Sequence, residues 1–226
     1  MASEDKPERR PRLDRRSRAA RAQGRGGREA LLEAAAALFA RRGFRETSID
    51  DIAREAGFSK GAVYWHFESK DDLFFALVEQ RIDRPLRAAL AELESAPAER
   101  DMAPVASEVF VALVEGQHDL VLLDREYWSL AVRDPQLRAR YAKRQAEIRR
   151  AFARALEARI RHLGAPVLAI PMEQLAAALL GLANGLALER LVDRSAVPDD
   201  LLGEMFAVFY AGLVARGQRP GPVKPG

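Results

Sequence analysis

The stretch from Thr47 to Phe67 reads TSIDDIAREAGFSKGAVYWHF, and it decides the fold. A hydroxyl residue followed three positions later by a carboxylate is a helix-capping pattern, so the segment Thr47–Asp51 predicts the start of a helix. Ala56-Gly57-Phe58 ends that helix early, and Ser59 can cap another that runs from Lys60 to about His66. Two short helices joined by a tight, glycine-containing turn are typical of a helix-turn-helix.

The two short helices have distinct inner and outer faces. Five apolar residues are spaced to hold the pair against a preceding helix: Ile49, Ile52, Ala53, Phe58 and Val63. On the outer face, Lys60 can donate to guanine edges, while Gly61 and Ala62 let the backbone lie close to bases in a major groove. Four side chains are placed to meet flanking phosphates: Thr47, Tyr64, His66 and Lys70. An ordinary helical hairpin that buries Tyr64 and Trp65 is the alternative interpretation.

Further helices are predicted on both sides of this stretch. A helix from about Arg28 to Arg42 ends at Gly43, a natural residue for the position after a helix. A longer helix begins near Lys70, and Pro85 is expected to kink or restart it, because proline removes an intrahelical hydrogen bond. Five more helices are expected downstream: Pro104–Gln117, Asp119–Arg133, Pro135–His162, Pro171–Val192 and Pro198–Arg216.

The composition favours an all-α fold. Apolar residues make up 48% of the 226 residues, which is enough for a substantial core. The chain is rich in Ala, Leu, Arg and Glu, all of which form helices readily. We therefore predict an N-terminal three-helix helix-turn-helix domain over 28–75 and a C-terminal helical domain over 76–216. A disordered basic arm (1–27) and a flexible tail (217–226) are expected to flank them.

The net charge of +3 hides an asymmetry. Ten basic and four acidic residues lie between Met1 and Arg28, so this arm is +6 and the rest of the chain is −3. A basic arm on a mildly acidic body suggests a polyanionic partner, either nucleic acid or an anionic membrane. A solvated arm that only aids solubility is the alternative.

Several other chemistries are excluded or disfavoured. The absence of cysteine excludes disulfides, thiol nucleophiles and cysteine-ligated metals. With no His-rich metal spacing or glycine-rich phosphate loop, we expect no enzyme, no metal and no cofactor. The N-terminus lacks the apolar run of a signal peptide. The most apolar stretch, Leu175–Leu188, is shorter than the ~20 residues that span a bilayer and contains Asn184, so we expect a soluble, cytoplasmic protein without a membrane partner.

The N-terminal region resembles the DNA-binding domain of the TetR family of transcriptional regulators, over about residues 28–75 and without gaps. The resemblance is carried by AAAALF at 34–39, GF at 43–44, TSIDDIA at 47–53, AGFSKG at 56–61 and VYWHF at 63–67, with Lys70 and Leu73. Tyr-Trp-His-Phe followed by Lys70 is particularly similar to the tetracycline and multidrug-efflux repressors. The resemblance implies double-stranded operator DNA as the partner. The implied base contacts come from Lys60, Gly61, Ala62 and Trp65, the phosphate contacts from Thr47, Tyr64, His66 and Lys70, and the capping residues Ser48 and Ser59 belong to the same surface.

The same resemblance implies that the region after residue 76 binds a ligand and forms a homodimer. Ala177, Gly181 and Gly185 recur every four positions, which makes a flat ridge where another helix can approach. Close packing within one subunit would serve equally well, but we expect a dimer seam that also includes Asn184 and Leu188. Asn184 could instead contact a ligand or bond to a backbone carbonyl.

Candidate ligand contacts come from two of the middle helices: Phe110, Glu126, Tyr127, Trp128 and Arg133. Aromatic side chains offer apolar area with a polar group, although a lone Trp on an amphipathic helix is more often part of a core. The predicted function is that of a repressor released from palindromic operator DNA by a small-molecule effector of unknown identity. A ligand-independent DNA-binding protein on the same fold, architectural or activating, is the alternative.

Overall fold

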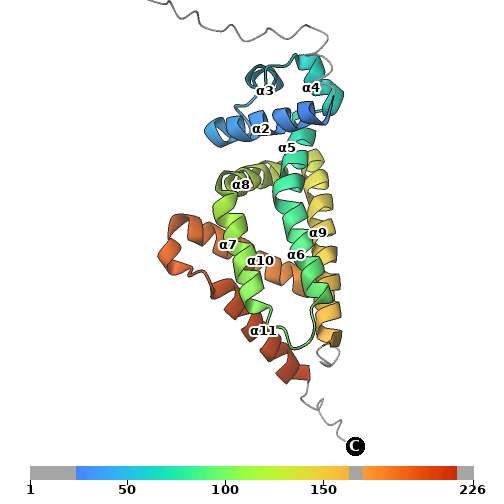
Figure 1. The fold of residues 1–226 in the computed structure, drawn as a ribbon, viewed down its shortest axis with the longest axis vertical. Helices are drawn as coiled ribbons and strands as arrows, with labels where there is room; N and C mark the ends of the chain where they lie inside the picture. Colours follow the sequence, from blue (N-terminus) through green and yellow to red (C-terminus); the bar gives the residue numbers. More distant parts are fainter. Residues whose placement is uncertain (1–23, 163–169, 218–226) are drawn as a thin grey trace, which may run out of the picture. The chain divides into compact units, whose positions relative to one another are not determined.

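The structure, a computed structural model, describes residues 24–162 and 170–217 (Figure 1). Within these ranges every regular element is helical, which confirms the all-α prediction. The chain divides between Leu77 and Val78 into an N-terminal and a C-terminal unit, near the boundary expected after residue 75. Most of the predicted basic arm and nearly all of the predicted flexible tail lie outside the described residues.

Over its described residues, the N-terminal unit contains four helices: α2 (Arg25–Arg42), α3 (Ile49–Glu55), α4 (Lys60–His66) and α5 (Lys70–Val78). Their apolar faces meet around Phe44, whose ring centroid lies 5.6 Å from those of both Phe39 and Phe74. Ile52 and Val63, from the two short helices, are fully buried in the same unit. Burial of each large apolar side chain contributes about 1.5–3 kcal/mol, so this small core holds α3 and α4 in place.

The C-terminal unit contains eight described elements: η1 (Glu79–Asp83), α6 (Arg84–Ser95), α7 (Ala103–Gly116), α8 (His118–Arg133), α9 (Pro135–His162), α10 (Met172–Val192), η2 (Arg194–Ala196) and α11 (Leu201–Gly217). The long helix α9 packs against α6, α8 and α10, and α7 packs against α11. Figure 1 shows α6 running alongside α9. The helices predicted from the proline and glycine positions are all present, with small shifts at their ends.

Helix α5 continues into a π-helical turn, η1, before α6 begins. Pro85 stands in the first turn of α6, so it restarts the helix as predicted. The wide turn precedes the proline and holds Asp83, which is only 2% exposed. Single π-helical turns are uncommon and often mark functional sites.

Helices α7 and α11 approach each other closely at their first turns. A Cβ atom at Gly203 would lie 2.1 Å from the carbonyl oxygen of Ala103, so only glycine fits there. The Gly203 amide donates to the hydroxyl of Ser107 at 3.0 Å, and that hydroxyl donates to the carbonyl of Asp200 at 3.1 Å. The buried serine therefore replaces hydrogen bonds that these backbone groups would otherwise make with water.

A buried arginine ties three segments of the C-terminal unit together. Arg190, on α10, donates to the carbonyl of Val197 and to Asp199, both at 2.6 Å, and also to Glu115 at the end of α7. The hydrogen bond from Arg190 is the main reason that the pKa of Asp199 is lowered. The charged group is thus paired on several sides, as a buried cation requires.

Helix α10 matches the predicted Pro171–Val192 to within one residue, but it is longer than the apolar stretch Leu175–Leu188. It spans 21 residues with a mean hydropathy of 1.5 in its most apolar window, so it is long and apolar enough to cross a membrane. The expectation that this segment is too short to span a bilayer was wrong, because the helix extends beyond Leu175–Leu188 at both ends. A single helix of this kind is weak evidence for a membrane span, since helices of soluble cores have the same composition. Only 28% of that window is buried, so α10 leaves much apolar surface uncovered.

Candidate nucleic-acid interface and internal cavity

A reciprocal capping box starts α3. The hydroxyl of Ser48 accepts from the Asp51 amide at 3.1 Å, and the Asp51 carboxylate accepts from the Ser48 amide at 3.3 Å. The Ser48 hydroxyl also donates to that carboxylate at 2.6 Å, and this bond, followed by the one from Arg54, lowers the pKa of Asp51. The predicted cap is confirmed, with Ser48 rather than Thr47 as the capping residue.

Gly57 makes the turn between α3 and α4. Its φ of 73° lies in the left-handed region, which side chains other than glycine rarely adopt. The amide of Phe58 donates to the carbonyl of Ala53 at 2.8 Å, and that of Gly57 donates to Arg54 at 3.1 Å. This pair of bonds is a Schellman motif, which ends α3 and turns the chain sharply into α4.

Helix α4 begins at a serine cap and leaves its aromatic residues exposed. The Ser59 hydroxyl accepts from the Ala62 amide at 3.2 Å. Tyr64 is 50% exposed and Trp65 61% exposed, which rules out a hairpin that buries this pair. The His66 ring packs edge-on against Trp65, with the ring centroids 4.5 Å apart.

The start of α4 is open toward solvent. Lys60 is exposed and forms an ion pair with Asp50 at 3.0 Å. Gly61 is also exposed, and a Cβ atom there would meet its first neighbour, the Ser59 hydroxyl, at 3.8 Å. That distance is an ordinary contact, so nothing within the chain requires glycine at this position.

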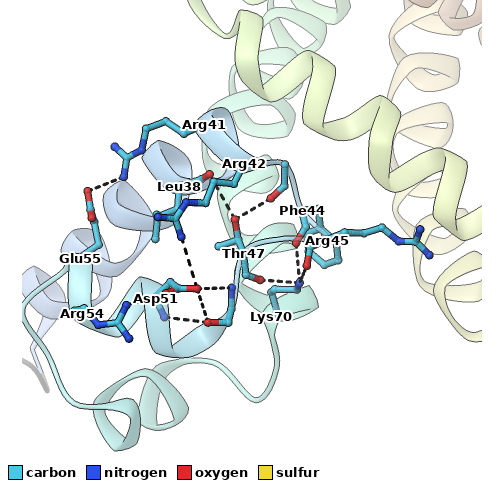
Figure 2. Close-up of polar contacts among 12 residues, drawn as sticks. Leu38, Arg41, Arg42, Phe44, Arg45, Thr47, Asp51, Arg54, Glu55 and Lys70 are labelled. Atoms are coloured by element: carbon cyan, nitrogen blue, oxygen red, sulfur yellow. Dashed lines mark hydrogen bonds and ion pairs between the residues drawn. The ribbon is translucent and has the colours of Figure 1, made fainter.

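Two residues predicted to contact phosphate, Lys70 and Thr47, form hydrogen bonds within the chain (Figure 2). The Lys70 ammonium donates to the carbonyls of Phe44, Thr47 and Arg45 at 2.7, 2.8 and 3.3 Å. Thr47 is 1% exposed, and its hydroxyl donates to the carbonyl of Gly43 at 2.8 Å. These bonds fasten the loop between α2 and α3 to the start of α5.

The C-terminal unit contains a partly open cavity of about 440 Å³. Its lining comes from η1 and from helices α6 to α11, and most of it is aliphatic or aromatic. Cavities of roughly 300–1,000 Å³ with this character are typical of small-molecule sites. Three aspartates and three arginines also line the cavity, so its ionisable groups sum to zero formal charge.

One part of the cavity lining is a polar cluster centred on Arg144. Its Nε and Nη2 donate to the two carboxylate oxygens of Asp83 at 2.8 and 2.7 Å, and its Nη1 donates to Asp124 at 2.7 Å. The Tyr141 hydroxyl donates to the other oxygen of Asp124 at 2.8 Å. Burial, and then the nearby charge of Asp124, raise the pKa of Tyr141. The cluster links η1, α8 and α9.

Two family models match the chain in sequence. Residues 31–77 match the model of bacterial regulatory proteins of the tetR family, and residues 115–215 match that of the C-terminal domain of BetI-type transcriptional repressors. The chain belongs to the TetR family. The helix-turn-helix of TetR-family regulators is thus the one formed by α3 and α4, and the resemblance stated from the sequence is confirmed.

Relatives of this TetR-family chain are similar over part of their length. The regulator YfiR of Bacillus subtilis is 31% identical over 131 residues, which are 56% of this chain and 62% of that protein. The regulator AcrR of Shigella flexneri is 44% identical over 52 residues, or 23% of this chain and 24% of that one. The alignments therefore span less than two thirds of either relative.

Solved TetR-family structures share the fold along most of the chain. SmeT, the repressor of a multidrug efflux pump of Stenotrophomonas maltophilia, has been solved in complex with triclosan. That complex has a TM-score of 0.61, is 23% identical, and covers 88% of this chain and 97% of its own. At this identity the likeness establishes the fold of the chain.

The five candidate ligand contacts do not lie together. Phe110 is buried and lines the cavity. Glu126, Tyr127, Trp128 and Arg133 are not among the residues that line the described cavity. Tyr127 is fully buried beside Tyr141, with the ring centroids 6.0 Å apart, whereas Trp128 and Arg133 are exposed. Of the two aromatic residues predicted on α8, Tyr127 is therefore a core residue and Trp128 a surface residue.

Of the predicted seam residues of α10, four are exposed and one, Asn184, lines the cavity. Ala177, Gly181, Gly185 and Leu188 are exposed, and a Cβ atom at either glycine would have no neighbour within 4 Å. Close packing of these glycines within the subunit is therefore excluded among the described residues. Asn184 lies on the cavity side, where its side-chain oxygen accepts from Arg125 at 2.9 Å.

The polar cluster was missed at the sequence level. Among the arginines of α9, Arg144 points inward, and its side chain is only 13% exposed. A signal was present, because Arg144 follows Tyr141 by three positions and precedes Ile148 by four. That spacing places all three on one helix face. A charged residue within an apolar stripe indicates a buried ion pair or a ligand contact.

Proposed function

We propose that this chain is a transcriptional repressor that binds palindromic operator DNA as a homodimer and releases it when a small molecule occupies the cavity. The observation that carries the proposal is the pairing, in one TetR-family chain, of a capped recognition helix with an apolar cavity of about 440 Å³. A protein that acts on operator DNA works in the cytoplasm, and no membrane partner is required.

The recognition surface consists of the exposed residues of α4 and the caps beside them. Trp65 and Tyr64 offer aromatic surface, and Tyr64 also has a hydroxyl that can donate a hydrogen bond. Lys60 can leave Asp50 to contact DNA, because an exposed ion pair contributes only about 0–1 kcal/mol. Gly61, which the chain itself does not require, would allow the backbone of α4 to approach the bases. Lys70 and Thr47 are left out of this surface, because their polar groups already bond to backbone carbonyls.

The dimer seam is proposed on the exposed apolar faces of α10 and α11. The exposed apolar or small residues of α10 include Ala177, Gly181, Gly185, Leu188 and Val192. On α11, Val208 and Phe209 are 60% and 45% exposed. Contiguous apolar surface of this kind is typical of protein interfaces, and small residues let two helices pack closely. A symmetric dimer would place two copies of α4 about 34 Å apart, to enter successive major grooves.

The coupling between ligand and DNA would pass through the π-helical turn. Asp83 belongs to η1, which directly follows the last helix of the N-terminal unit, and Arg144 holds Asp83 and Asp124 together at one part of the cavity lining. A ligand that alters this cluster would bias the geometry of η1 and hence of α5. A coupling of about 1–3 kcal/mol is enough to change operator affinity five- to 150-fold.

The test is fluorescence anisotropy with a labelled duplex taken from the region upstream of the protein's own gene. Lys60→Ala and Trp65→Ala are each expected to weaken binding about tenfold or more. Matched controls exist in the exposed Lys143→Ala and in Trp128→Ala, the other tryptophan of the chain. Weak binding that disappears with salt and ignores both substitutions in α4 would overturn the proposal, because it indicates only non-specific charge attraction.

A further inference from the structure

At the polar part of the cavity, the carboxylate acceptors have hydrogen-bond donors, whereas one buried donor has no acceptor among the described residues. Both oxygens of Asp83 accept from Arg144, and Asp124 accepts from Arg144 with one oxygen and from Tyr141 with the other. Among the residues that the structure describes, the two carboxylates are therefore already well supplied with donors. A cationic ligand would find no unpaired negative charge at this cluster.

Arg125 on α8, which bonds to Asn184 on α10, has a donor that no protein group uses within the described residues. Nη2 of Arg125 donates to Asn184 at 2.9 Å and more weakly to Asp124 at 3.4 Å. Nε of Arg125 is buried and has no acceptor among the described residues. Arg125 and Asn184 both line the cavity.

A buried donor without an acceptor is unfavourable, and a ligand that supplies an acceptor oxygen removes this penalty. The rest of the lining is mainly apolar, with residues such as Phe110, Phe152 and Phe206. A matching ligand therefore has an apolar body and one end that carries acceptor oxygens. Since the ionisable groups of the lining sum to zero, either a carbonyl or a carboxylate can supply the acceptor.

We propose that the cavity binds a largely apolar molecule whose acceptor-bearing end, a carbonyl or a carboxylate, is held by Arg125 and Asn184, and that it discriminates against organic cations. This inference rests on the proposed function, in which the cavity is the effector site. It names the chemical class of the effector and assigns specificity to two residues on different helices, 59 positions apart in the sequence.

Calorimetry with the full chain and three ligands of equal tail length tests the ligand class: decanoate, methyl decanoate and decyltrimethylammonium. We expect one or both acceptor-bearing ligands to bind at least about tenfold more tightly than the cation. A higher affinity for decanoate than for methyl decanoate assigns the site to anions. Equal affinities for the two assign it to carbonyls, and both results support the inference. Preferential binding of the cation, or binding of none of the three, overturns it.

Variants then test the two residues. Arg125→Met and Asn184→Leu remove the donors and keep similar volume, and each should weaken the acceptor-bearing ligands by about tenfold while leaving the cation unaffected. Arg133→Met, an exposed arginine of the same helix, is the matched control. The assignment is contradicted if both variants keep the wild-type affinity for decanoate and methyl decanoate and also have the far-UV circular dichroism spectrum of the folded wild type.

The same ligands added to the DNA complex separate this inference from the proposed function. Calorimetric binding without release of DNA would support the ligand class and contradict control by an effector. Release of DNA by the cation alone would support control by an effector and contradict the ligand class.

Discussion

The Lys70 ammonium nitrogen lies 2.8 Å from the carbonyl oxygen of Thr47 and 4.4 Å from the ring centroid of Phe44. A cation in this position satisfies carbonyls in the loop that precedes α3. Lys70 therefore stabilises the loop between α2 and α3.

Lys70→Ala should therefore destabilise the N-terminal unit by about 2–3 kcal/mol, because hydrogen bonds to a charged donor are stronger than neutral ones and three carbonyls lose it. Urea unfolding followed through Trp65, in a Trp128→Phe background, measures the change. Lys143→Ala should leave the midpoint unaltered. If Lys70→Ala keeps full stability and loses only DNA affinity, the residue contacts phosphate after all.

Gly57→Ala should cost about 1–2 kcal/mol, since an L-residue is strained at a φ of 73°. The space around the new methyl group is open, so the cost is that of the backbone alone. Gly116→Ala provides the comparison, because its position is also open but without positive φ. Thermal unfolding monitored by circular dichroism distinguishes the two, and equal midpoints would contradict the assigned turn.

Arg144→Leu should destabilise the C-terminal unit by about 3–5 kcal/mol, because it leaves Asp83 and Asp124 buried without their cation. Arg150→Leu, at an exposed position of the same helix, should have little effect. Urea unfolding by circular dichroism gives both values. A loss below about 1 kcal/mol for Arg144→Leu would mean that the network is open to water.

Gly181→Leu should weaken dimerisation, because an added side chain on the exposed small-residue face of α10 would hold two facing helices apart. Sedimentation velocity over a dilution series measures the dissociation constant, which should rise at least tenfold. Gly116→Leu, on an open position of α7, serves as the control. An unchanged constant for Gly181→Leu would place the seam elsewhere.

The capping box predicts an acid-sensitive stability of α3. Hydrogen bonds from Ser48 and Arg54 lower the pKa of Asp51, so its contribution is present above the unfolded-state value of 3.8 and is lost as the pH falls below it. Asp51→Asn should lower the melting temperature at neutral pH. The difference in melting temperature between the variant and the wild type should become smaller as the pH falls toward about 3. A difference that stays constant across this pH range would contradict a role for the ionised Asp51 carboxylate.

The local structure of the helix-turn-helix was predictable from sequence because its determinants lie within a few residues of each other. Ser48 and Asp51 are three positions apart, as are Ser59 and Ala62, and Gly57 acts through its own backbone angle. The exposure of Trp65 followed from the same spacing.

The sequence by itself thus determined the helices, their caps, the turn at Gly57 and the family. The tertiary structure decided which polar groups meet: Arg125 with Asn184, Arg144 with Asp83, and Lys70 with Thr47 are separated by 59, 61 and 23 positions. The physical reason is that helix formation depends on neighbours three and four residues apart, whereas contacts between helices depend on how their faces pack together. Packing also placed Asn184 in the cavity lining and left Gly181, three positions before it, exposed.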